Sequence, residues 1–172
     1  MSNTTAVESK NEIIPAAAPI AGLYQVVSQL IEKSLVDLQE EHLHARPNKQ
    51  TNSIHWIFGH LIDARYEVAR FLGATAEHSF GKMFCMGEEV TDPADYPSLE
   101  ELQESFKKIS SVLDERFKSV TEAEFGAEVE NAFPGQAKTV AGCVTFLSFH
   151  EAYHVGQIAL VRKFFGYENL VG

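Results

Sequence analysis

Residues 149–157 read FHEAYHVGQ and lie within a long apolar run near the C-terminus. At 3.6 residues per turn, His150 and His154 are one turn apart on the same helical face, so their imidazoles project in parallel. Such a pair can bind a transition metal. The same letters also match H-E-x-x-H, the zinc-metalloprotease motif in which the glutamate is the general base. Other features of the sequence are needed to distinguish between these two interpretations.

The helix that contains this stretch is predicted to begin near Lys138 or Thr139 and to continue to Phe165, where Gly166 ends it. One of its apolar stripes includes both histidines, and a second stripe is mostly aromatic. The second stripe consists of Phe146, Phe149, Tyr153, Leu160 and Phe164. A helix that is apolar on two sides is either central to a large core or covered by a partner. Four helices give only a modest core, so we predict a homodimer contact through this helix.

The N-terminal residues 1–19 are rich in Ser, Thr, Ala and Pro, and their prolines interrupt any helix. We therefore predict a flexible lead-in there. From Ile20 the apolar spacing becomes that of an amphipathic helix, which we expect to end near residues 41–44, ahead of Pro47. Residues 20–172 are predicted to form a single domain, because a chain of 172 residues can bury one ordinary core.

A second helix is predicted from an N-cap at Asn52 or Ser53 to Leu72, where a glycine follows. His60 lies on the face of this helix that should be buried. A buried imidazole needs a partner for each nitrogen, and a metal is one such partner. His55, five residues earlier, has no evident function.

A third helix begins after Ser98, with Glu101 at the capping-box position, and carries a single apolar stripe from Leu99 to Val120. The connection before it, residues 73–97, contains three glycines and two prolines without a lasting period. Long structureless connections are uncommon in compact domains and are usually functional, so this one could cover a pocket. The residues that we expect it to contribute are Phe80, Met83, Phe84 and Met86.

The metalloprotease interpretation lacks a third ligand, because the 18 residues after His154 contain no histidine and only one carboxylate, Glu168, beyond the helix end. A set of strands to align a peptide substrate is also missing from the pattern. By contrast, His60, His150 and His154 lie on inward stripes of two predicted helices. Three histidines with an open fourth position are the ligand set of a catalytic zinc site, and nickel or ferrous iron also accept imidazole.

Composition excludes several other classes of protein. The formal charge is −10, and the basic residues are scattered, which argues against binding a nucleic-acid backbone. Cys85 and Cys143 match no disulfide framework or metal spacing. The sequence has no secretory signal and no 18-residue apolar stretch, so we expect a cytoplasmic protein without membrane contact.

The segments NSIHWIFGHL (residues 52–61) and HEAYHVGQI (residues 150–158) together resemble the DinB-like superfamily, and the resemblance covers residues 20–167. It implies an all-α fold, a four-helix bundle with long crossover connections. It also implies frequent homodimers and a metal bound by one histidine of the second helix and two of the fourth. By position, these ligands fall on His60, His150 and His154.

The named activities of such proteins are thiol transfers that use bacillithiol or mycothiol and a mycothiol-dependent isomerisation. The resemblance thus favours a metal-dependent S-transferase that acts on small electrophiles with a low-molecular-weight thiol. One alternative is a hydrolase that uses a metal-bound water, and another is a metal-stapled binding or scaffold protein without chemistry. Zinc is the favoured divalent metal, with nickel or iron as alternatives.

Glu151, adjacent to the first histidine of the pair, is the candidate catalytic proton acceptor, although a solvent-facing side chain is the more ordinary interpretation of a glutamate at that position. Gln157 could orient a ligand or satisfy backbone groups. An anionic thiol would need positive charge close to the metal, which Arg65, Arg70 or Arg162 could supply.

Overall fold

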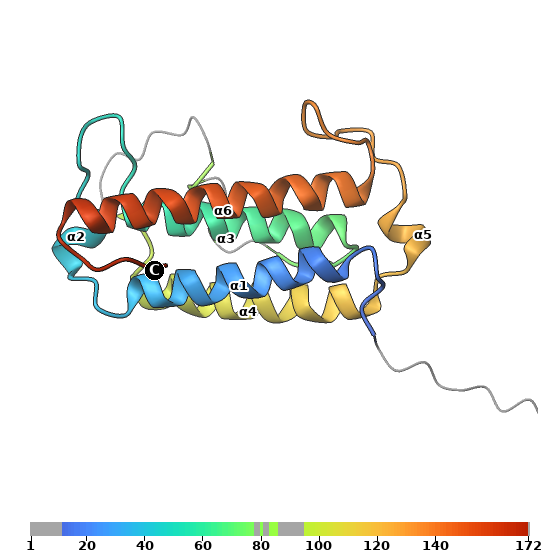
Figure 1. Ribbon diagram of the computed structural model, residues 1–172, viewed down its shortest axis with the longest axis horizontal. Helices are drawn as coiled ribbons and strands as arrows, with labels where there is room; N and C mark the ends of the chain where they lie inside the picture. The colour runs from blue at the N-terminus through green and yellow to red at the C-terminus, as the bar shows by residue number, and fades with distance from the viewer. Residues whose placement is uncertain (1–11, 78–79, 81–82, 86–94, 172) are drawn as a thin grey trace, which may run out of the picture.

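The computed structural model describes residues 12–77, 80, 83–85 and 95–171. The helices in these residues are α1 (Ala18–Leu35), α2 (Glu40–His44), α3 (Ile54–Phe71), α4 (Leu99–Ser119), α5 (Glu122–Phe125) and α6 (Val140–Phe164). The four long helices lie side by side as a bundle, with the short α2 and α5 at opposite ends (Figure 1). The predicted all-α four-helix bundle is confirmed. Within the described residues, β pairing is limited to an isolated bridge between Glu128 and Thr139.

The order of the helices around the bundle brings α3 and α6 together. Helix α3 packs against α4 and α6, and α1 packs against the same two helices. Helices α3 and α4 run in the same direction, whereas α6 runs the opposite way (Figure 1). The connection between α3 and α4 must therefore return along the bundle, while residues 120–139 join α4 to α6 at one end. The two helices that carry the three predicted ligands are antiparallel neighbours.

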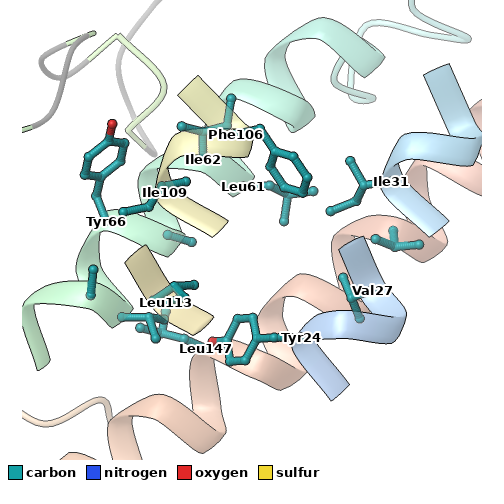
Figure 2. Packing of buried hydrophobic residues seen from close by; sticks show 14 of the residues in the cluster. Tyr24, Val27, Ile31, Leu61, Ile62, Tyr66, Phe106, Ile109, Leu113 and Leu147 are labelled. Carbon is teal, nitrogen blue, oxygen red and sulfur yellow. The ribbon is translucent and has the colours of Figure 1, made fainter. Parts of the chain in front are cut away.

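The core lies between the four long helices, and each helix contributes large apolar side chains to it (Figure 2). The residues labelled there are all buried: Tyr24, Val27, Ile31, Leu61, Ile62, Tyr66, Phe106, Ile109, Leu113 and Leu147. Burial of this apolar surface is the main favourable contribution to folding. None of the described helices combines the length and the apolar character needed to cross a membrane.

Most helix ends follow the local signals in the sequence. The Ser53 side chain accepts a hydrogen bond from the Trp56 backbone N–H at the start of α3. Ser98 and Glu101 form a reciprocal capping box at the start of α4, and Thr139 caps α6. Gly166 follows α6 with a φ of 85°, a backbone conformation that favours glycine. These predicted boundaries are confirmed.

The first predicted helix is wrong in one respect, because it is two helices with a break between Leu35 and Glu40. Arg162 of α6 donates one hydrogen bond to the Ser34 carbonyl and another to the Asp37 carboxylate. Arg162 thereby satisfies a backbone carbonyl at the end of α1 that would otherwise need a partner. The contact spans more than 120 residues of sequence, so no local signal predicts the break.

The predicted lead-in is partly packed. Helix α1 begins at Ala18, with Pro19 in its first turn, where a missing N–H has no cost. Ala17 is fully buried, and Ile13 and Ile14 pack against the core. Residues 1–11 of the predicted lead-in lie outside the described residues.

A buried ion pair joins α3 to α6. Arg65 and Glu151 are each 1% exposed, and two nitrogens of the guanidinium, Nε and Nη2, donate to the two carboxylate oxygens at 2.6 and 2.9 Å. Arg65 also donates to the Ser110 hydroxyl and lies over the Phe106 ring. Burial raises the pKa of Glu151, and the Arg65 charge opposes that rise. Paired in this way, the two charged groups fix how far α3 can slide along α6.

His55, at the start of α3, forms a hydrogen bond with the last residue of the connection between α3 and α4. Its Nε2–H donates to the Pro97 carbonyl at 2.8 Å, so its Nδ1 is free to accept a hydrogen bond from His44 Nδ1–H at 3.1 Å. Burial, and secondly the neighbouring His44, lower the pKa of His55 to about 4. His55, without an assigned function in the sequence, is thus a neutral structural anchor.

Removing one partner of the buried ion pair should destabilise the protein strongly. Glu151→Gln leaves the Arg65 charge buried without a counter-charge, so we expect the free energy of unfolding in urea to fall by about 3–5 kcal/mol. The matched control is Glu67→Gln, because Glu67 pairs with Arg70 on the solvent-exposed side of α3. That change should cost less than about 1 kcal/mol. Similar losses for the two variants would contradict the interpretation.

His55 should make stability depend on pH. Its pKa in the folded protein is about 4, below the value of about 6.5 expected when unfolded. The unfolded chain therefore takes up a proton first, and the contribution of neutral His55 is lost as pH falls from about 6.5 to 4. We expect His55→Gln to be less stable than the wild type at pH 7.5, and the difference to shrink by about 2–3 kcal/mol by pH 4.5. Urea unfolding of both proteins across this pH range measures the difference. If the difference in free energy of unfolding between the wild type and His55→Gln stays constant with pH, His55 does not titrate in this way.

Candidate metal centre

Three histidines converge between α3 and α6. His60 Nε2 lies 3.0 Å from His150 Nε2, and His150 Nε2 lies 3.0 Å from His154 Nε2. Within the described part of the chain, these three residues form the one group of three or more histidine, cysteine or acidic side chains whose ligand atoms all lie within 4.8 Å of one another. The structure therefore brings together the three residues that the sequence nominated as metal ligands.

The hydrogen bonds of two rings fix which nitrogen faces the centre. His60 Nδ1–H donates to the Phe84 backbone carbonyl at 2.8 Å, and His154 Nδ1–H donates to the Gln157 side-chain oxygen at 2.7 Å. Because oxygen acceptors require the proton on Nδ1, the lone pairs of these neutral rings lie on Nε2. Both lone pairs point toward His150. Histidines that bind metals are generally oriented by such contacts of the other ring nitrogen.

The donor set fits a metal ion better than it fits hydrogen bonding alone. His150 can place at most one proton between the lone pairs of its two neighbours. One of the two neighbouring lone pairs is then left without a proton, whereas a metal ion could accept the Nε2 lone pairs of all three rings. The buried Nδ1 of His150 has no hydrogen-bond partner among the described residues in either case. Two imidazole nitrogens bound to one zinc ion at a tetrahedral angle lie about 3.3 Å apart. The observed separations of 3.0 Å are therefore close to the separation that a shared ion requires.

The environment keeps all three imidazoles neutral at pH 7. Burial lowers the pKa of His60, although the Phe84 carbonyl and Asp63 oppose the shift. Burial lowers the pKa of His150 and His154 to about 4, and the other imidazoles of the cluster contribute further. A neutral imidazole can bind a metal without first losing a proton. Three neutral imidazoles of this kind are a ligand set that a transition-metal ion can accept.

Aromatic side chains border the cluster. The Trp56 ring stacks on His60 with its centroid 4.9 Å away, and the exposed Tyr153 ring meets His154 edge-on at 5.2 Å. His154 is 7% exposed, whereas His150 is partly accessible to solvent. A separate hollow of about 590 Å³ is lined by α2 and its N-cap, and not by the three histidines.

The solvent-facing alternative for Glu151 is wrong, and its carboxylate is not free for the predicted catalytic function. Glu151 leaves α6 about 100° around the helix axis from His150, and it is buried against Arg65, with both oxygens accepting hydrogen bonds. A signal for this burial existed in the sequence. Glu151 continues the spacing of four buried α6 residues: Val144, Leu147, Val155 and Ile158.

The three arginines that could have attracted an anionic thiol are each paired with a carboxylate. Arg65 pairs with Glu151, Arg70 with Glu67, and Arg162 with Asp37. The Arg65–Glu151 pair is buried, whereas the side chains of Glu67, Arg70 and Asp37 are largely exposed. An anionic ligand would have to compete with a carboxylate for each of these arginines.

The partner that orients His60 could not be identified from the sequence. Phe84 lies in the predicted pocket-covering connection, but it contributes a backbone carbonyl, and a backbone group leaves no signal in residue type. Phe84 is fully buried, and Phe80 and Met83 pack against the core. Met86 lies outside the described residues. Gln157, by contrast, was a candidate, and its contact with His154 follows from their spacing of three along α6.

Comparisons with known proteins agree with this architecture. Among solved structures, the chain is similar to YfiT from Bacillus subtilis, described as "a probable metal-dependent hydrolase with an unusual four-helix bundle topology". The two share 14% sequence identity with a TM-score of 0.57, over 98% of this chain and 94% of that chain, a likeness that shows the fold. A comparison with curated proteins gave no match. The sequence profile of the DinB superfamily matches residues 23–158, most of the chain. The chain therefore belongs to the DinB superfamily.

Proposed function

We propose that the protein is a metal-dependent hydrolase whose divalent metal is held by His60, His150 and His154. The single observation that carries this proposal is the convergence of three neutral imidazole nitrogens from two helices. Three imidazoles occupy only part of a coordination sphere and leave room for water or substrate. In such a site, a bound ion lowers the pKa of water and polarises the bond to be cleaved. Zinc is the proposed metal, and nickel and ferrous iron have the same donor preference.

The chain itself positions the site and limits its chemistry. The Phe84 carbonyl and the Gln157 side chain orient two of the ligands, and the Arg65–Glu151 pair holds α3 against α6. Glu151 acts here as a positioning residue, because its carboxylate is committed to Arg65. The proposed substrate is a small molecule.

Hydrolysis is favoured over thiol transfer by the pairing of the arginines. An anionic low-molecular-weight thiol would need a free cation close to the metal, whereas Arg65, Arg70 and Arg162 each have a carboxylate partner. A water molecule needs no such cation. The S-transferase that the family resemblance favoured is therefore the second candidate, and the experiment below separates it from hydrolysis.

Metal binding should depend on each of the three histidines. After dialysis against Zn²⁺, we expect about one equivalent of metal per wild-type chain, and a loss of at least tenfold in affinity for His60→Ala. His42→Ala is the matched control, because His42 bonds to Tyr167 and stacks on Phe165. Elemental analysis measures the metal content. Unchanged zinc in His60→Ala, or an equal loss in His42→Ala, would refute the ligand assignment.

Hydrolytic activity should depend on the bound metal. We expect the zinc-loaded protein to hydrolyse members of a panel of activated esters and amides, to lose this activity with a chelator, and to regain it with Zn²⁺. A parallel reaction contains a low-molecular-weight thiol and 1-chloro-2,4-dinitrobenzene. Metal-dependent conjugation without hydrolysis would favour the S-transferase. If neither reaction responds to the chelator, a metal-stapled binding or scaffold protein is the better description.

The protein also forms, we propose, a homodimer through α6. Four large side chains of this helix are exposed by more than half: Phe149, Tyr153, Leu160 and Phe164. At 100° per residue they lie within about 60° of one another around the helix axis, so they form one continuous apolar face. Scattered exposed apolar residues are ordinary, but a contiguous face is typical of an interaction site.

Charges on that face should dissociate the dimer. We expect a dimer mass by light scattering at micromolar concentration for the wild type, and a monomer mass for Phe149→Glu/Phe164→Glu. The matched control is Val36→Glu, because Val36 is 83% exposed but lies at the end of α1. This control should remain dimeric. A wild-type monomer would rule the dimer out.

A further inference from the structure

The acceptor that orients His60 comes from a distant part of the chain. Phe84 follows His60 by 24 residues, and its carbonyl oxygen lies 2.8 Å from His60 Nδ1. A carbonyl can only accept, so the His60 proton must be on Nδ1 and the lone pair on Nε2. His60 Nε2 is the nitrogen that faces His150 at 3.0 Å. The position of one backbone carbonyl therefore decides which nitrogen His60 presents to the centre.

The side chain of Phe84 determines where this carbonyl lies. The ring is fully buried, stacks on Tyr96 with centroids 5.4 Å apart, and meets Phe80 edge-on at 6.1 Å. Tyr96 is followed by Pro97, whose carbonyl accepts a hydrogen bond from His55 of α3. The ring is thus packed on several sides, and the backbone of Phe84 is fixed with it.

Gly59 provides the space on α3 that the Phe84 ring occupies. A Cβ atom at position 59 would lie 2.4 Å from Phe84 Cε1 and 2.5 Å from both Cδ1 and Cζ. These distances are far below van der Waals contact, so no other residue fits unless the ring moves. A glycine inside a helix costs about 1 kcal/mol relative to alanine. The helix itself gains nothing from glycine here, whereas the packing of Phe84 depends on it.

We infer that Gly59 and Phe84 are positioning residues for His60. The absent side chain at Gly59 lets the Phe84 ring lie directly on α3, and the ring in turn places the Phe84 carbonyl on His60 Nδ1. His60 then presents Nε2 to the centre before any ligand binds. The inference rests on the proposed metal site for its functional consequence, but the orientation of His60 is a property of the metal-free protein.

The first test measures the His60 tautomer directly. In metal-free wild-type protein at pH 7.5, ¹⁵N NMR of the imidazoles should assign the His60 proton to Nδ1. A proton on Nε2 would overturn the inference without any variant. This result does not depend on metal binding, so a failed metal site and a failed positioning role can be told apart.

The second test displaces the Phe84 ring by a substitution at Gly59. Gly59→Ala should displace Phe84, weaken the Nδ1 preference of His60, and lower Zn²⁺ affinity by about 10- to 100-fold, the usual effect of losing a contact that orients a ligand. Gly22→Ala is the matched control, because it adds the same methyl group to α1 where nothing lies within 4 Å. It should keep the wild-type affinity. Competition with a chromogenic chelator measures both.

A compensating variant separates positioning from a general loss of structure. Gly59→Ala/Phe84→Leu adds a methyl group to α3 and removes the ring atoms that it would meet, so the total volume is nearly conserved. We expect this double variant to recover the Nδ1 tautomer and most of the Zn²⁺ affinity. The inference is overturned if Gly59→Ala binds zinc like the wild type, or if the folded double variant remains as weak as the single one.

Discussion

The ion pair between Arg65 and Glu151 is the contact on which the geometry of the candidate centre depends. It joins the two helices that carry the three histidines, five residues after His60 on α3 and one residue after His150 on α6. A slide of one residue along a helix is about 1.5 Å, enough to break hydrogen bonds of 2.6 and 2.9 Å. The same slide would separate the imidazole nitrogens.

Stability alone does not explain why two charged groups lie at the centre of the bundle. Transferring an arginine and a glutamate from water costs several kcal/mol each, and apolar residues of similar volume often give an equally stable core. A shifted alignment of α3 and α6 would separate the pair and leave two buried charges without partners, which costs about 3–5 kcal/mol. We therefore regard the ion pair as a contribution to the specificity of packing between α3 and α6. The same alignment sets the relative positions of the three histidines.

Much of the fold could be predicted because the signals that define it are local. The caps at Ser53, Ser98 and Thr139 and the apolar stripes placed three of the long helices close to their observed bounds. The break between α1 and α2 has no such local signal, and the side chain that contacts Ser34 and Asp37 there is Arg162, which comes more than 120 residues later. The burial of Glu151 was predictable in principle from its spacing. The H-E-x-x-H motif favours a catalytic glutamate at this position, but the apolar spacing of the neighbouring residues is the stronger signal.

The sequence identifies the three histidines, but it does not identify all the groups that orient their rings. His60 is oriented by a backbone carbonyl from the long connection, His154 by a side chain of its own helix, and His150 by neither among the described residues. Both of the 3.0 Å separations involve His150, one with each oriented ring. A ring without a second partner is the one that can adjust when an ion enters. The difference between the observed separations of 3.0 Å and the roughly 3.3 Å of a tetrahedral zinc site can therefore be taken up by His150 alone, with the hydrogen bonds of both oriented rings intact.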